Sequence, residues 1–412
     1  MNREIKQRID QIKNGEVPQG YKKTKIGIVP NDWEICKAKN VFKNVSDKNH
    51  KGELEVLSVT QDRGVIPRSH VDIDIKYDLS NVVNYKKVER GDFVISLRSF
   101  QGGIEYSDYT GLVSPAYTVL KNIRDIKSVY YKTYFKSDNY IKQLNVAVYG
   151  IRDGKQISYD DFGFIEILYP PLNEQQKISD ILSIQDKVIE LKEKLLKEKE
   201  KQKKYLMQNL LTVRKRLKGF NGEWKKVKLK EYLMEISERN KGLKINNVLS
   251  VNNKLGFVKQ EIQFGKTVAS KDLSNYKIIK NNFIAYNPSR INVGSIAIYQ
   301  GEVQGIVSPM YVVFKTNEML DSNYFMFFVQ SYEFFEKMKS LLSGSVRDSL
   351  NFSDLCNMQI LLPSLEEQKA IAEILTTADK ELKLLQEELE EEKRKKKALM
   401  QLLLTGIVRV KV

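Results

Sequence analysis

The sequence predicts an α+β protein in which two tandem α/β domains are each followed by a long helix, the two helices pairing as a coiled coil. Two observations lead to this fold class. One is an internal repeat at an offset of 190–195 residues, and the other is a pair of long stretches without glycine or proline. The chain has 412 residues, of which 42% are hydrophobic, so each half can bury a core of its own.

The repeat consists of matching segments that occur in the same order in both halves. The matches cover seven of eleven, five of eleven and eight of ten positions in GLVSPAYTVLK (111–121) with GIVSPMYVVFK (305–315), NEQQKISDILS (173–183) with EEQKAIAEILT (366–376), and KKYLMQNLLT (203–212) with KKALMQLLLT (396–405). Similarity is lowest in 60–84 against 252–275 and in 97–110 against 286–304. This pattern indicates one framework that is used twice to bind two different things.

Short strand patterns and one helix pattern precede each long helix. Strands are predicted at 93–97, 113–120 and 164–168 in the first half, and at 282–286, 306–314 and 358–362 in the second. Helices are predicted at 128–144 and 322–341. Prolines end the last strand of each half, because proline cannot donate to a ladder.

The two stretches that follow, 173–216 and 366–404, contain good helix formers and an apolar residue every three or four positions. The predicted seams are Ile181, Ile184, Val188, Leu191 and Leu195 in the first helix, and Leu375, Ala378, Leu382, Leu385 and Leu389 in the second. A helix of about 40 residues would be about 60 Å long and needs a partner for its apolar stripe. The obvious partner is the other copy; the alternative is two separate helices, each packed on its own domain.

These patterns divide the chain into six segments. They are an N-terminal helical arm (1–24), a first α/β domain (25–171), a first long helix (172–218), a second α/β domain (219–363), a second long helix (364–405) and a C-terminal tail (406–412).

Charge favours a polyanionic partner. The formal net charge is +16 and the isoelectric point is near 9.4, which is typical of nucleic-acid binding, although a lysine-rich proteome would also give this value. The two cysteines are far apart, which excludes a disulfide framework and a zinc spacing. The charged start MNREIKQRID lacks the apolar core of a signal peptide, and no apolar run is long enough to cross a membrane. A cytoplasmic protein without membrane contact is expected.

The sequence contains no complete motif for catalysis. The closest match to an adenine-methyltransferase motif, Asn287-Pro288-Ser289-Arg290, lacks the second proline and the aromatic residue. No phosphate-binding GxxxxGK[ST] loop occurs. The acid-x-Lys triplet in Asp72-Ile73-Asp74-Ile75-Lys76 has no preceding Pro-Asp, and the only two histidines are both in the first half. The chain is therefore expected to have no catalytic residue, metal or cofactor.

The divergent segments contain the residue types that bind bases. Arginine and lysine suit guanine, asparagine and glutamine suit adenine, and serine binds less selectively. The candidates are Gln61, Arg63, Arg68, Arg98, Ser99, Gln101, Arg152 and Lys155 in the first half, and Asn252, Asn253, Lys254, Ser289, Arg290, Asn292 and Arg347 in the second. For any one of them an ordinary solvated loop is an equally good interpretation, but the set, aligned between halves and different in identity, favours DNA recognition.

The doubled order of motifs resembles the specificity subunits of type I restriction-modification systems. The resemblance rests on a Pro-Leu-x-Glu-Gln motif, on a long helix that closes with Leu-Met-Gln-x-Leu-Leu-Thr, and on the opening Gly27-x-Val29-Pro30-x-x-Trp33. The motif appears as Pro170-Pro171-Leu172-Asn173-Glu174-Gln175 and again as Leu362-Pro363-Ser364-Leu365-Glu366-Glu367-Gln368, where Ser364 replaces the middle proline.

This resemblance implies two target recognition domains, each reading one half of a bipartite, asymmetric site in double-stranded DNA. It implies that the long helices form an antiparallel coiled coil, and that two methyltransferase (modification) subunits and restriction subunits bind this non-catalytic chain. Three other interpretations stay open: a free-standing DNA-binding regulator, a methyltransferase or nuclease, which the absence of motifs disfavours, and a coiled-coil scaffold without a modification partner.

Overall fold

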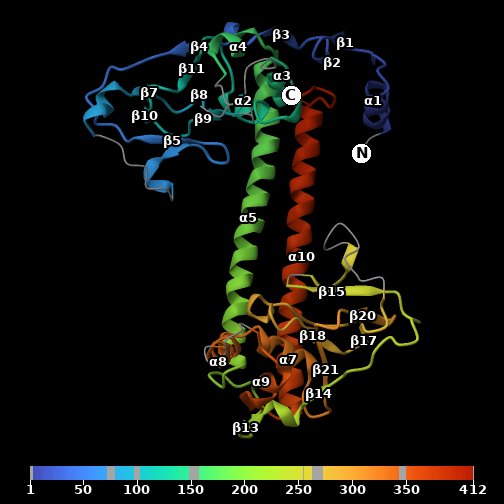
Figure 1. Cartoon of the computed structure of the whole chain (residues 1–412). Helices are drawn as coiled ribbons and strands as arrows, with labels where there is room; N and C mark the ends of the chain where they lie inside the picture. The colour runs from blue at the N-terminus through green and yellow to red at the C-terminus, as the bar shows by residue number, and fades with distance from the viewer. Residues whose placement is uncertain are drawn as a thin grey trace. The chain divides into compact units, whose positions relative to one another are not determined.

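The computed structural model describes residues 3–71, 79–96, 103–147, 157–253, 255–261, 272–342 and 349–411. The chain divides into two compact units, Met1–Lys192 with Glu388–Val412, and Glu193–Glu387. Two helices of 39 residues, α5 (Leu172–Leu210) and α10 (Leu365–Leu403), contribute one part to each unit (Figure 1). These two units are defined by which residues pack together, whereas the six predicted segments are consecutive stretches of the chain. The six boundaries therefore stay a prediction.

The first unit contains a four-stranded antiparallel sheet with the order β4-β11-β8-β9. These strands are β4 (Phe42–Val45), β8 (Phe93–Ile95), β9 (Ile104–Tyr106) and β11 (Thr118–Asn122). Antiparallel pairs join β1 (Tyr21–Thr24) to β2 (Gly27–Pro30), β3 (Glu34–Lys37) to β12 (Glu166–Tyr169), β5 (Leu57–Thr60) to β6 (Gly64–Pro67), and β7 (Lys86–Val88) to β10 (Gly111–Val113). The shorter helices are α1 (Arg3–Lys13), α2 (Ser128–Tyr134), α3 (Asp138–Ala147) and α4 (Tyr159–Phe164).

The second unit has the same strand order. One sheet is β14-β21-β18-β19, made of β14 (Leu233–Glu235), β18 (Ile284–Tyr286), β19 (Ile296–Ile298) and β21 (Val312–Thr316). The other is β16-β15-β20-β17, made of β15 (Val248–Asn252), β16 (Gly256–Lys259), β17 (Lys277–Ile279) and β20 (Gly305–Val307). The remaining elements are the pair β13 (Lys225–Lys228) and β22 (Gln359–Leu362), and the helices α7 (Ser322–Val329), α8 (Tyr332–Leu342) and α9 (Phe352–Asn357).

The two units therefore correspond strand by strand, down to an unusual detail. In the second unit β15 and β20 pair in parallel, with Val248 opposite Ile306. The first unit has the equivalent parallel bridge between Val56 and Leu112. A parallel contact at the same place in both units is specific enough to show that the sequence repeat is a structural one.

Some predicted elements are wrong in extent. The predicted strand 113–120 is two strands, because Ser114 to Tyr117 form a turn around Pro115. The predicted helices 128–144 and 322–341 are each broken into two. The break falls at a serine that caps the next helix: Ser137 Oγ accepts from the amide of Tyr140, and Ser331 Oγ accepts from the amide of Phe334.

Aromatic side chains fill the core of each domain. In the first unit, Phe42 lies edge-to-face against Phe93 and Tyr131, with ring centroids 5.5 and 5.3 Å apart. In the second unit Phe314, in β21, lies edge-to-face against Phe325 of α7, with ring centroids 5.9 Å apart. Such pairs add about 0.5–1.5 kcal/mol each beyond the area that they bury. The aromatic rings therefore hold the helices against the sheet.

Each core continues onto the long helices. In the first unit it includes Ile178 and Leu182 of α5 and Leu403 of α10, and in the second it includes Leu210 of α5 and Leu375 of α10. Each domain is thus fixed to both helices by apolar contact. Among the described residues, no helix is long and apolar enough to cross a membrane.

The long helices run antiparallel within each unit. In the first, Gln185 Nε2 donates to Glu392 Oε2 at 2.6 Å and Lys192 pairs with Glu388 at 2.6 Å. In the second, Lys199 pairs with Glu381 at 2.6 Å, and Lys203 pairs with Asp379. Residue numbers rise along α5 as those of the partners fall along α10, as an antiparallel pair requires.

The predicted seam of α5 is wrong in register. Ile184, Leu191 and Leu195 are 67%, 53% and 44% exposed, and Ile181 and Val188 are only half-buried. The inward side of α5 contains instead Ile178, Leu182, Gln185, Ile189, Lys192, Leu196, Lys199, Lys203, Leu206 and Leu210. Polar residues occupy several of these positions, because they pair with acidic residues of α10. Following apolar residues alone therefore selected the neighbouring stripe.

The stripe predicted on α10 lies on a less exposed side of that helix. Leu375 and Leu389 are buried, and Ala378, Leu382 and Leu385 are half-buried. The two helices thus differ: α10 presents apolar residues where α5 presents the stems and charges of lysines. Lysine stems cover apolar surface well while their ammonium groups reach acidic partners.

A residue with a left-handed backbone follows α5 and gives a stability prediction. Val213 has φ +62°, and its counterpart after α10 is Gly406, with φ +71°. A β-branched residue is strained in this region by about 1–2 kcal/mol, part of which is offset because glycine makes the unfolded chain more flexible. We expect Val213→Gly to raise the free energy of unfolding by about 0.5–1 kcal/mol, measured by urea denaturation of the full chain.

The matched control is Gly406→Val. A Cβ at this position would lie 2.6 Å from Cδ of Pro30, and φ is positive, so this change should destabilise the protein by about 2 kcal/mol or more. Destabilisation by Val213→Gly would contradict the prediction that Val213 is strained.

Candidate nucleic-acid interface

The β5–β6 turn presents candidate base-reading residues of the first unit. Gln61 and Arg63 are exposed, and hydrogen bonds inside the turn hold its conformation. Thr60 Oγ1 donates to the carbonyl of Gly64 at 2.9 Å and accepts from the amide of Arg63 at 3.2 Å. Arg63 Nη1 also donates to the carbonyl of His70 at 3.0 Å, but a guanidinium has five donors, so others stay available for a ligand.

The turn is fixed against β9 by a close backbone contact. Gly64 has φ +74°, and a Cβ on it would lie 2.8 Å from the carbonyl oxygen of Tyr106. Only glycine fits there. Val65 then forms a parallel bridge with Ser107. Arg68, the remaining candidate in this part of the chain, is half-buried at the start of a 3-10 turn (Arg68–His70).

The equivalent turn of the second unit lies beside a second candidate segment. Asn252 is half-buried and Asn253 exposed between β15 and β16. A Cβ on Gly294 would lie 3.8 Å from Cβ of Asn253, and Ser295 Oγ donates to the carbonyl of Val251 at 3.2 Å. The structure therefore places the 252–253 turn next to the β18–β19 connection. The exposed candidates Ser289, Arg290 and Asn292 belong to this connection.

Seven candidates lie outside the described residues: Arg98, Ser99, Gln101, Arg152, Lys155, Lys254 and Arg347. They stay predictions from the sequence.

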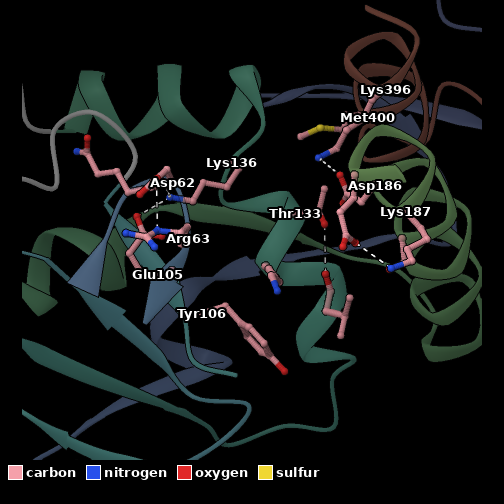
Figure 2. A pocket seen from close by; sticks show the side chains of 16 residues that line it. Asp62, Arg63, Glu105, Tyr106, Thr133, Lys136, Asp186, Lys187, Lys396 and Met400 are labelled. Carbon is pink, nitrogen blue, oxygen red and sulfur yellow. Dashed lines mark hydrogen bonds and ion pairs between the residues drawn. The ribbon is translucent and has the colours of Figure 1, made fainter. Parts of the chain in front are cut away.

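Each unit has a cleft beside the turn that contains its candidate base-reading residues. The first, of about 540 Å³, lies between the β5–β6 turn, β9, α2 and the long helices, and its lining includes Arg63, Glu105, Lys136 and Asp186 (Figure 2). The second, of about 690 Å³, has the equivalent lining segments, including Asn253, Ala297, Gln330 and Asp379. The lining of this cleft is thus mostly charged in the first unit, and mostly amide and apolar in the second.

A second pair of clefts lies beside α3 and α8. These cavities, of about 280 and 530 Å³, share several residue types at equivalent positions. The matching pairs are Lys397 and Lys204, Met400 and Met207, Gln401 and Gln208, Thr405 and Thr212, and Ser137 and Ser331. Lys397 and Gln401 are exposed, as are Lys204 and Gln208, so core packing does not account for their identity between the repeats.

A half-buried lysine recurs in both domains and was missed from the sequence. Lys86 Nζ donates to the carbonyl of Tyr117 at 2.6 Å, and Lys277 Nζ donates to the carbonyl of Tyr311 at 2.7 Å. Burial lowers the pKa of both ammonium groups. The sequence contains a pattern that could have predicted this contact: both lysines follow an Asn-Tyr pair, and both tyrosines close the repeated Val-Ser-Pro-x-Tyr motif.

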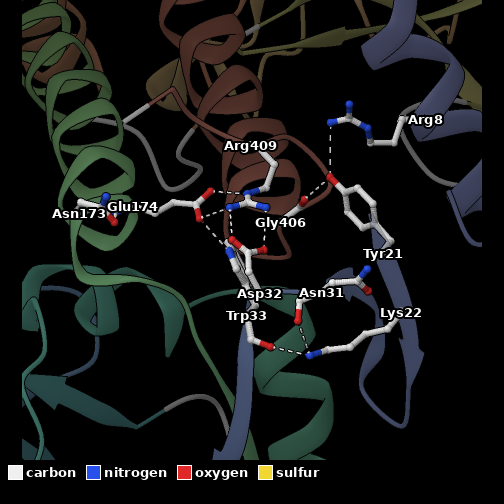
Figure 3. Close-up of polar contacts among 10 residues, drawn as sticks. All are labelled: Arg8, Tyr21, Lys22, Asn31, Asp32, Trp33, Asn173, Glu174, Gly406 and Arg409. Carbon is white, nitrogen blue, oxygen red and sulfur yellow. Dashed lines mark hydrogen bonds and ion pairs between the residues drawn. The ribbon is translucent and has the colours of Figure 1, made fainter. Parts of the chain in front are cut away.

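A buried glutamate connects each domain to the long helices. Glu174, at the start of α5, accepts a 2.8 Å hydrogen bond from Nε1 of Trp33 and two from Arg409, which follows α10 (Figure 3). Arg409 also binds Asp32 in a bidentate manner at 2.8 Å, and these bonds lower the pKa of the Asp32 carboxyl. The second unit repeats the arrangement with Glu367, Trp224 and Arg216.

The glutamine that follows each glutamate completes the junction. Gln175 donates to the carbonyl of Pro170 at 2.8 Å and accepts from the amide of Lys127 at 3.0 Å. Gln368 donates to the carbonyl of Pro363 at 3.0 Å and accepts from the amide of Asp321 at 2.9 Å. The repeated Glu-Gln motif therefore satisfies backbone groups at the site where strand, helix and domain meet.

Comparison with known proteins identifies the class. A model for the type I restriction modification DNA specificity domain matches residues 30–201 and again 221–393. The chain is 25% identical over 429 residues to a putative type I restriction enzyme MjaX specificity subunit of Methanocaldococcus jannaschii, covering 95% of this chain and 97% of the relative. It is 27% identical over 416 residues to the MjaVIII specificity subunit of the same organism, covering 93% and 94%.

A solved structure has the same fold. The S subunit of a type I restriction-modification system from M. genitalium superposes with a TM-score of 0.55 at 14% sequence identity, covering 92% of this chain and 97% of that one. The chain belongs to the family of type I restriction-modification specificity subunits. Membership implies recognition of DNA sequence, and specificity subunits are the non-catalytic members of their complexes. Within the described ranges, no group of acidic, histidine or cysteine residues could hold a metal ion.

The junction at Glu174 gives a stability prediction. The Glu174 side chain is 1% exposed and Arg409 is its cationic partner, so Arg409→Ala would leave a buried carboxylate with only the Trp33 hydrogen bond. Breaking a buried pair is costly, and since Arg409 is itself partly exposed we expect a loss of about 2–3 kcal/mol. Lys397→Ala, which removes an ion pair to Asp138 with both side chains more than half exposed, should cost less than about 0.5 kcal/mol.

Urea denaturation of the full chain would measure both variants. Hydrogen exchange at 404–411 should also rise in Arg409→Ala, because this segment loses its anchor. Equal stability of Arg409→Ala and the wild type would contradict the assigned role of the pair.

Proposed function

We propose that each recognition domain reads one half of a bipartite, asymmetric site in double-stranded DNA and directs modification and restriction subunits to it. The chain would supply sequence recognition and positioning, and the partners would supply methyl transfer and cleavage. Because its substrate is chromosomal DNA, the complex would act in the cytoplasm. No cofactor is assigned to this chain.

One observation carries this proposal. Two equivalent folds present different exposed side chains at equivalent turns: Gln61 and Arg63 in one, Asn253 in the other. A duplicated structural part would need no such difference, whereas a duplicated reader of two unlike sequences would. Arginine binds guanine in a bidentate manner and asparagine binds adenine, so the two turns should prefer different bases.

The test is a pair of single substitutions. Arg63→Ala should weaken or alter recognition of one half-site, and Arg290→Ala should affect only the other. Each lost bidentate contact should cost about 1–3 kcal/mol. Mapping of methylated adenines across the genome of cells that carry each variant would show which half changes. If both variants changed the same half-site, two independent readers would be excluded.

Two modification subunits are assigned to the clefts beside α3 and α8. The exposed lysine and glutamine and the half-buried methionine that line both clefts are the same, although the reading turns differ. Identity on an exposed surface in both repeats is what two copies of one partner require, because each copy meets the same residues. The exposed Ile184 and Leu191 of α5 offer further apolar surface for docking in the first unit.

Stoichiometry tests this assignment. Gln208→Arg or Gln401→Arg alone should reduce the complex from two modification subunits to one, because a long charged side chain would fill a single cleft. The double variant should bind none, and Lys201→Ala, at an α5 position 73% exposed, should still bind two. Native mass spectrometry of the co-expressed complex gives the count. Two bound copies on the double variant would place docking elsewhere.

The same complexes separate the remaining alternatives. A free-standing regulator would bind a specific DNA site but no modification subunit. A scaffold would bind the partner protein but would not change methylation when Arg63 or Arg290 is replaced.

A further inference from the structure

The cleft of the first unit contains a buried charge that the reading residues do not explain. Glu105, in the middle of β9, has a side chain 1% exposed, and its Oε1 lies 2.5 Å from Nζ of Lys136 (Figure 2). Burial raises the pKa of the Glu105 carboxyl, and Lys136 opposes that effect. A buried carboxylate costs stability compared with an apolar residue, so a second role is required to account for it.

The same lysine also contacts the reading turn. Lys136 Nζ donates to the backbone carbonyl of Gln61 at 3.3 Å. Gln61 lies at one end of the turn, and at the other end Gly64 is packed on the carbonyl of Tyr106, the neighbour of Glu105. Between these two fixed points lie Asp62 and Arg63. The turn is therefore held at both ends against β9, and the ammonium group of Lys136 supplies one of these attachments.

The second unit lacks this pair. Glu105 lies opposite Val94 in its sheet, and the equivalent position opposite Ala285 is Ala297. Lys136 precedes the serine that caps α3, and the residue that precedes the capping serine of α8 is Gln330. Both members of the pair are thus replaced together. There, Phe257 of β16 packs against Tyr299 with centroids 5.1 Å apart, so an aromatic contact holds the turn instead.

We propose that Glu105 and Lys136 are positioning residues for the first recognition domain. Glu105 fixes the ammonium group of Lys136, Lys136 fixes the carbonyl of Gln61, and the turn then presents Gln61 and Arg63 in the geometry that its half-site requires. Bidentate base contacts depend on such geometry, because both hydrogen bonds must form at once. The inference rests on the proposed function of the turn and adds residues that never touch DNA.

The decisive variant is the double substitution Glu105→Ala with Lys136→Gln, which copies the residues of the second unit. It removes the ion pair without leaving a buried charge, so it should fold as stably as the wild type. A purely structural pair would therefore be repaired by it, whereas a positioning pair would not. We expect the full chain, co-expressed with its modification subunits, to lose discrimination about tenfold at the first half-site and to keep the second unchanged.

Three further variants complete the test. Lys136→Met leaves Glu105 buried and unpaired, and should lower the melting temperature as well as alter the first half-site. Lys136→Arg keeps the charge beside Glu105 and should fold normally, with a smaller loss of discrimination. Lys132→Ala removes a lysine of α2 that lines the same cleft and pairs with Asp108, and should leave both half-sites unchanged.

Genome-wide mapping of methylated adenines and thermal melting of each complex are the readouts. An unchanged first half-site in the double variant and in Lys136→Arg would overturn the proposal. Arg63→Ala, measured in parallel, distinguishes failure of the positioning role of the pair from failure of the reading role of the turn. If it alters the first half-site while the pair variants do not, the positioning role fails and the reading role stands. If Arg63→Ala and Gln61→Ala both leave the half-site unchanged, the reading role of the turn itself fails.

Discussion

The structure depends on one buried carboxylate in each unit, Glu174 and Glu367. Each accepts hydrogen bonds from the tryptophan that precedes a domain and from the arginine that follows the opposite long helix. The energetic asymmetry of buried ions explains why all three groups recur together: the complete set is tolerated, whereas an incomplete one leaves an uncompensated charge. This constraint fixes the end of each domain to both helices.

Polar pairing also determines how the helices meet. α5 contributes lysines and Gln185 to the contact, and α10 contributes acidic residues and leucines. A seam of this kind is less apolar than a leucine zipper, but it specifies register and direction, because each lysine must reach its acidic partner. It also leaves Ile184 and Leu191 on the outside of α5, where a soluble helix pair gains nothing from them.

The fold was predictable because its signals are local or repeated. Heptad spacing, proline stops and the ordered matches predicted the domains and helices. The capping serines Ser137 and Ser331 explain why two predicted helices are each broken in two. The seam of α5 was not predictable from apolar spacing, since four of its ten inward positions are polar. The Glu174 junction was also out of reach, because Arg409 lies 235 residues away. Of the candidate site, the residue types of the turns were predictable, but the contacts that hold the first turn were not, because Lys136 and Glu105 are brought together only by the fold.

The chain segments that make up each unit have a consequence for biosynthesis. The second unit is one continuous segment, Glu193–Glu387, whereas the first needs Glu388–Val412, including Leu403 and Arg409, to complete its core and its junction. Domains fold as units as the chain leaves the ribosome. The domain that is translated first therefore matures last: it waits, with Ile178 and Leu182 uncovered, while the later domain is made and folded. During that interval the nascent protein has one finished domain and one unfinished one, and the junction of Glu174 with Arg409 has not yet formed.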